Sequence, residues 1–201
     1  MPRHDRQQRH TANLRASIAS VAARLIAEDG ISDYHQAKLK AARQLGAPAH
    51  TPFPDNAEVD SELRAYQSLY LGDEHLELLQ QMRETAIELL EMFVDFSPYL
   101  TGSVLEGTAG EHSTIDILLF PDSAKEVEIF LLNRDITFDH LEPRNEKVEA
   151  VFSLSTEAGD VKLIIMPPHL ERMAFKGKDG RVRERAKIDA VRALIAEPSI
   201  T

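Results

Sequence analysis

Residues 99–120 read Y-L-T-G-S-V-L-E-G-T-A-G-E-H-S-T-I-D-I-L-L-F, and this stretch decides the fold. It predicts a buried strand that ends at Gly102 and Ser103, a glycine-rich loop, and a second strand that carries Asp116 among apolar residues. Backbone N–H groups of such a loop can converge on an anion because no bulky side chain covers them. An acidic residue on the neighbouring strand can hold a hard cation against that anion. The stretch therefore predicts a phosphate site, and the simpler alternative is an ordinary hairpin.

The order of these motifs resembles the signature of the nucleotidyltransferase superfamily, the DNA polymerase beta-like fold. Gly102 and Ser103 match the Gly-Ser pair that ends the first strand, and Asp116 matches the second acid of the D-x-D pair on the second strand. The resemblance implies that Asp116 is the catalytic residue. The residues that it assigns to nucleotide binding are Gly102, Ser103, Gly107, Thr108 and Ser113.

The acidic motif of the family is incomplete in this chain. Thr114 occupies the position of the first acid, where a second carboxylate would share a face of the strand with Asp116 and hold Mg²⁺. The third carboxylate of the family lies on a later strand, predicted here at 161–166. If the two strands align as we expect, Lys162 stands at that position, and Asp160 replaces it if the register differs by two. The resemblance thus implies a Mg²⁺ site with Asp116, Thr114 as a weak ligand and Asp160 as an alternative ligand.

The order of predicted elements favours an α+β fold. Helices come first, followed by the two strands above, a helix, three more strands and a last helix, with an antiparallel hairpin over 148–166. This order suits a nucleotidyltransferase-like mixed sheet with helices packed on it, preceded by an N-terminal helical region. We expect the division at 1–95 and 96–201, with a frayed polar tail at 1–10 and a proline-rich linker at 47–56.

The predicted helix over 74–95 carries an apolar stripe whose members recur every three or four residues. Such a stripe packs either on the sheet of the same chain or against a second copy of the helix. The core interpretation is favoured because the stripe is too short to indicate a coiled coil. The stripe consists of Leu79, Met82, Ala86, Leu89 and Phe93.

Composition limits the classes of protein that fit. The chain has 201 residues, no cysteine and a formal net charge of −10, so disulfides and thiolate metal sites are excluded and broad nucleic-acid binding is not expected. No apolar run approaches the length of a membrane span, and the N-terminus lacks the apolar core of a signal peptide; we expect a cytoplasmic protein with no membrane contact. The densest basic run is expected to be a solvated turn or to neutralise a triphosphate; it comprises Lys176, Lys178, Arg181, Arg183, Arg185 and Lys187.

Two functions of different classes follow from these observations. The first is a nucleotidyltransferase-like protein that binds a nucleoside triphosphate and, if its site is active, transfers a nucleoside monophosphate to an unknown acceptor. The alternative is a catalytically weakened or inactive member of the fold that binds a nucleotide or a protein partner, as an antitoxin-like module would. A homodimer formed through the helix over 74–95 is a weaker third alternative.

Overall fold

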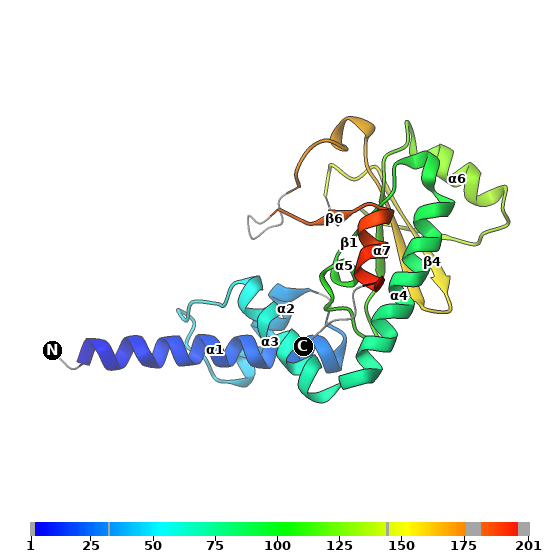
Figure 1. The fold of residues 1–201 in the computed structure, drawn as a ribbon. Helices are drawn as coiled ribbons and strands as arrows, with labels where there is room; N and C mark the ends of the chain where they lie inside the picture. Colours follow the sequence, from blue (N-terminus) through cyan, green and yellow to red (C-terminus); the bar gives the residue numbers. More distant parts are fainter. Residues whose placement is uncertain (1–2, 32, 144, 176–181, 197–201) are drawn as a thin grey trace. The chain divides into compact units, whose positions relative to one another are not determined.

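The structure is a computed structural model of the chain, and its architecture is α+β, as the sequence predicts (Figure 1). Within the described residues it has seven α-helices and one six-stranded mixed sheet. The chain divides into two compact units, a helical unit at residues 1–75 and a sheet unit at residues 76–201. The structure describes residues 3–31, 33–143, 145–175 and 182–196.

The helical unit packs α2 (Tyr34–Gln44) and α3 (Asn56–Tyr70) against α1 (Arg3–Asp29). Alanines supply much of its core, which lets the helix backbones approach closely. The helix α1 begins at Arg3, so the prediction of a frayed tail at 1–10 is wrong. Arginine and glutamine are good helix formers, and they extend the helix without needing an apolar stripe. Fully buried members of the core are Ile18, Ala22, Ala23, Ala37, Ala41 and Val59.

Polar side chains fix the predicted linker between α2 and α3. Asp55 and Glu58 form a reciprocal capping box at the start of α3, which begins at Asn56. The buried ammonium of Lys38 donates to the backbone carbonyl of Pro54 at 3.1 Å and to Asn56 Oδ1 at 2.8 Å. The linker is therefore an ordered connection inside one unit and does not separate two domains.

The sheet unit has the strand order β3-β4-β5-β2-β1-β6. The neighbours β2 and β5 run parallel, and every other neighbouring pair is antiparallel. The predicted hairpin is confirmed as β4 and β5, whereas β6 was not predicted. The strands are β1 (Tyr99–Thr101), β2 (Ile115–Leu119), β3 (Asp139–Leu141), β4 (Ala150–Thr156), β5 (Gly159–Ile165) and β6 (Arg185–Ala186).

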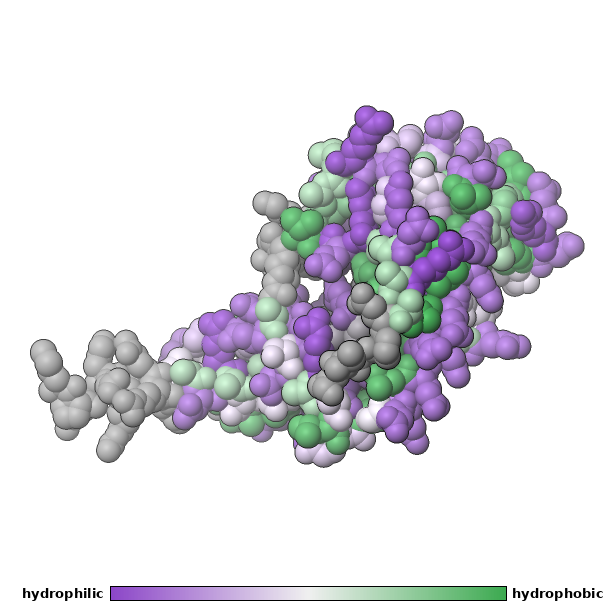
Figure 2. Space-filling view, in the orientation of Figure 1, coloured by the Kyte–Doolittle hydropathy of each residue, from purple (hydrophilic) through white to green (hydrophobic). Residues whose placement is uncertain are grey.

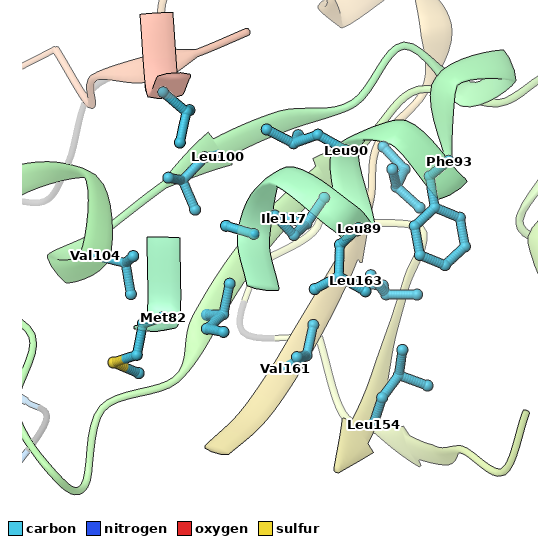
Figure 3. Packing of buried hydrophobic residues seen from close by; sticks show 14 of the residues in the cluster. Met82, Leu89, Leu90, Phe93, Leu100, Val104, Ile117, Leu154, Val161 and Leu163 are labelled. Carbon is cyan, nitrogen blue, oxygen red and sulfur yellow. The ribbon is translucent and has the colours of Figure 1, made fainter. Parts of the chain in front are cut away.

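Helix α4 (Gly72–Met92) lays its apolar stripe on the sheet (Figure 3). Leu89 is only 6 % exposed within this core, so the core interpretation of the stripe is confirmed and dimerisation through it is not. Because α4 packs on the strands, the boundary between the units falls after residue 75 and not after residue 95. The same core includes buried residues of α6 (Ala124–Leu132) and α7 (Ile188–Ala196).

Hydrophilic residues predominate on the side of each unit that Figure 2 shows. The most exposed of the large apolar side chains within the described residues are Leu69, Tyr70, Val94 and Leu132. None of the helices in the described ranges combines the length and the apolar composition that a membrane span requires.

Candidate functional site

Gly102 joins β1 to the short helix α5 (Ser103–Glu106), and two constraints require glycine there. Its backbone has φ 76° and ψ −160°, a conformation that other residues rarely adopt. A Cβ atom at this position would also lie 3.2 Å from Oδ2 of Asp116. The turn therefore brings the backbone of Gly102 directly against the Asp116 carboxylate, as expected for two parts of one site.

The loop after α5 uses its own backbone donors internally. The N–H groups of Thr108 and Ala109 both donate to the carbonyl of Ser103, at 2.9 and 3.1 Å. The N–H of Gly110 donates to Ser113 Oγ at 2.9 Å. These contacts shape the loop and occupy the donors that the sequence suggested for an anion. The side chain of Ser113 thus stabilises the loop by accepting a hydrogen bond from the loop's own backbone.

Arg83 on α4 donates hydrogen bonds to backbone carbonyls of α5, which follows the same turn. Its Nε donates to the carbonyl of Val104 at 3.2 Å and its Nη2 to the carbonyl of Leu105 at 3.5 Å, so the guanidinium caps the C-terminal end of α5. A Cβ on Gly107, which has φ 79°, would lie 3.5 Å from Nη2. Burial lowers the pKa of Arg83, but an arginine remains charged at neutral pH. Sequence reasoning missed this residue because its contacts are long-range.

A row of polar residues crosses the sheet on the face opposite to α4. Each member pairs directly with the next across neighbouring strands, and directly paired residues share a face of the sheet. We call this set the polar row. From β3 to β6 it comprises Asp139, Ser153, Lys162, Asp116, Thr101 and Arg185.

At the centre of the polar row, Asp116 and Lys162 are linked through Thr114, which precedes β2 and is not itself a member of the row. Thr114 Oγ1 donates to Asp116 Oδ1 at 2.8 Å, and Lys162 Nζ donates to Thr114 Oγ1 at 3.2 Å. Lys162 pairs in register with Asp116, which confirms the strand alignment that the sequence suggested. Among the residues that the structure describes, Thr114 is the one hydrogen-bond partner of the Lys162 ammonium, and the side chain is half-buried.

Asp160 lies at the hairpin end of β5, pairs with Ser155 and accepts a hydrogen bond from Ser155 Oγ at 3.0 Å. The register therefore leaves Lys162, and not Asp160, opposite Asp116. Mg²⁺ prefers an octahedral set of oxygen ligands that includes carboxylates. Among the described residues, the centre of the row contains one carboxylate, a hydroxyl that donates to it, and an ammonium. Within the described ranges no group of three or more His, Asp or Glu residues could hold a metal ion, and this donor set does not fit Mg²⁺.

A cavity of about 430 Å³ lies at the β6 end of the sheet. Its charged lining has three arginines against one glutamate, in a chain whose net charge is −10. Apolar side chains from α5 and from the segment before β6 form the rest of the lining. Such a cavity favours an organic anion over an inorganic one. The residues that line it are Leu105, Arg172, Met173, Ala174, Phe175, Val182, Arg183, Glu184, Arg185 and Ala186.

Arg185 belongs to both the polar row and the cavity. Its guanidinium lies over the rings of Tyr99 at 4.7 Å and Phe175 at 5.6 Å, and its Nη2 donates to the carbonyl of Glu171. Its Nη1 is buried and has no hydrogen-bond partner among the described residues. The basic run in the sequence pointed to this region; its members Lys176, Lys178 and Arg181 lie outside the described residues.

A scan against protein-family models, a search of curated proteins and a search of solved structures each gave no match.

Proposed function

We propose that the sheet unit binds a nucleoside triphosphate along the polar row and acts as a nucleotide-binding module. The observation that carries the proposal is the position of Lys162, which lies in register with Asp116 at the centre of the sheet. Gly102 packs against the same carboxylate. The ammonium of Lys162 can therefore donate charge-assisted hydrogen bonds to a phosphate group beside this turn, while Asp116 holds Thr114, the residue that contacts the ammonium.

The charge and lining of the β6 end support an organic anion as ligand. A triphosphate carries several negative charges, and charge-assisted hydrogen bonds from ammonium and guanidinium groups are the strong ones. Arg185 and Asp116 belong to the same polar row, and the strand β1 lies between their two strands. Because neighbouring strands lie about 4.8 Å apart, an extended triphosphate can reach from one residue to the other. The apolar part of the cavity lining then suits the nucleoside.

Nucleotidyl transfer is the second candidate. It is favoured by Asp160, which lies two residues before Lys162 on β5. Residues two apart on a strand point to the same side, so Asp160 shares the face of the sheet that carries Asp116. Transfer requires strong stabilisation of charge in the transition state, for which enzymes usually use metal-bound carboxylates. The side chain of Asp160 is engaged with Ser155, so the geometry favours binding over transfer.

Calorimetric titration of the full chain with ATP, GTP, CTP and UTP tests the proposal. We expect at least one of them to bind, and at about a hundred times its dissociation constant to stabilise the folded protein by about 2.7 kcal/mol. Adenosine and inorganic triphosphate are the matched controls, because each keeps one part of the ligand. Absence of binding by all four nucleotides would contradict the proposal. Release of pyrophosphate by the wild type, lost in Asp116→Ala, would favour transfer.

A further inference from the structure

We propose that Lys162 is the built-in cation of this site, so that the nucleotide binds without a divalent metal ion. The inference rests on the proposed function and concerns the same face of the sheet. It starts from the disagreement between the Mg²⁺ that the family resemblance implies and the residues that the polar row contains.

The position of the ammonium is set by Asp116 on β2 and by Thr114, which directly precedes that strand. Asp116 accepts the hydroxyl proton of Thr114, which orients the lone pairs of Thr114 Oγ1 toward Lys162 Nζ at 3.2 Å. A lysine side chain is otherwise flexible, and this contact holds it over the centre of the sheet. In this arrangement Asp116 is a positioning residue, because it acts on the ligand through Thr114 and Lys162.

The donors of Lys162 fit a phosphate oxygen. An ammonium has three N–H donors and no acceptor, and Thr114 takes one of them. No carboxylate lies within salt-bridge distance of the ammonium among the described residues, so its charge is available to an anion. The side chain is half-buried, and partial removal from water strengthens a charge-assisted hydrogen bond.

The same ammonium opposes a divalent cation. A Mg²⁺ ion bound by Asp116 would lie next to the Thr114 hydroxyl, and Lys162 already donates to that hydroxyl. Like charges at such separations repel, and the repulsion is greatest where water is partly excluded. Mg²⁺ also loses its hydration shell reluctantly, so a single carboxylate next to an ammonium compensates that loss poorly. The nucleotide is therefore expected to bind equally well with and without Mg²⁺.

The first experiment is calorimetric titration of the wild-type chain with ATP and GTP, in excess EDTA and in excess Mg²⁺. We expect dissociation constants in the two buffers to agree within about threefold. Lys162→Met keeps the length of the side chain and removes its charge, and we expect it to weaken binding by about tenfold or more in both buffers. The matched control is Lys125→Met, which removes an exposed lysine on α6 and should leave the affinity unchanged.

Two further variants separate a lost cation from a damaged fold. Lys162→Arg keeps the charge, so it should retain most of the affinity while Lys162→Met does not. Lys162→Asp places a second carboxylate in register with Asp116, so it should acquire binding of Mn²⁺ to the nucleotide-free protein, measured by electron paramagnetic resonance. Circular dichroism of each variant monitors folding.

The outcomes distinguish the inference from the function on which it rests. Binding in Mg²⁺ with none in EDTA would overturn the role of Lys162 and leave nucleotide binding intact. Full affinity of a folded Lys162→Met variant would also overturn that role. No binding in either buffer would refute the proposed function, and the inference with it.

Discussion

The two faces of the sheet use alternate residues of the same strands for different purposes. On β2, Ile115 and Ile117 are fully buried against the helices, whereas Asp116 lies half-buried on the other face, next to Thr114, which precedes the strand. On β5, Leu163 is fully buried and its neighbour Lys162 is not. Because side chains alternate along a strand, one face supplies the main apolar core, while the other presents the polar row beside a smaller apolar cluster around Phe120, Met166 and Leu170. The residues that form the main core and those proposed to bind the nucleotide thereby alternate along the same strands.

The largest test of this separation compares neighbouring positions on β5. Leu163→Ala removes a fully buried side chain and leaves a cavity, so we expect it to lower the free energy of unfolding of the sheet unit by about 2 to 5 kcal/mol. Lys162→Ala should lower it by less than about 1 kcal/mol, because the side chain is half-buried and makes one hydrogen bond. Hydrogen exchange of the β2 and β5 amides measures both. Equal losses of unfolding free energy in the two variants would contradict the view that the two faces have different roles.

A smaller effect is expected at the turn that brings the backbone to Asp116. Gly102→Ala places a side chain in a strongly disfavoured backbone conformation and 3.2 Å from the Asp116 carboxylate, so it should cost about 1 to 3 kcal/mol. The matched control is Gly110→Ala, because a Cβ there meets nothing within 4 Å and φ is not positive. Thermal unfolding of the two variants makes the comparison. If Gly110→Ala were equally destabilising, the close approach at Gly102 would not explain the loss.

The smallest effect is expected in the helical unit, at the solvent-exposed ion pair between Arg15 and Glu58. The hydrogen bond from Arg15 lowers the pKa of the Glu58 carboxyl. A lowered folded-state pKa adds stability that is present above the unfolded value, about 4.3, and is lost as the pH falls through the folded value. Glu58→Gln removes this dependence but retains an acceptor for the capping box, so it should cost less than about 1 kcal/mol at pH 7.

An acid titration of helix content in the wild type and in Glu58→Gln measures this effect. The wild type should lose its small advantage as the pH falls below about 4, and the two curves should then meet. Curves that remain parallel down to the lowest pH would show that the ion pair contributes no stability of this kind.

Elements with strong local patterns were predictable from the sequence. The β4–β5 hairpin follows from alternating residues and a turn, and α6 begins after Ser123, a residue type typical of a helix N-cap, whose side chain accepts from the N–H of Lys125. Two elements were missed for physical reasons. The short α5 depends on the unusual backbone of Gly102, and β6 has two residues, so its pairing with β1 is a tertiary contact without a local signal.

The candidate site was predictable at its centre and not at its edges. The spacing along β2 and β5 suggested Lys162 opposite Asp116, with Asp160 as the alternative in a register shifted by two, and the structure has the first of these. The hydrogen bonds that close the loop at Ser113 depend on loop geometry, which residue types do not determine. The packing of Arg185 over Tyr99 joins residues far apart in the chain, so the sequence indicated only a basic run.

The measurement that tests the central claim most directly is a methyl NMR titration of the full chain with ATP in EDTA. Threonine and isoleucine methyl groups report separately on the two faces of the sheet. We predict that Thr101 and Thr114 shift with ATP concentration while Ile115 and Ile117 change little. Shifts confined to the isoleucines, or to the helical unit, would contradict a nucleotide site on the polar row.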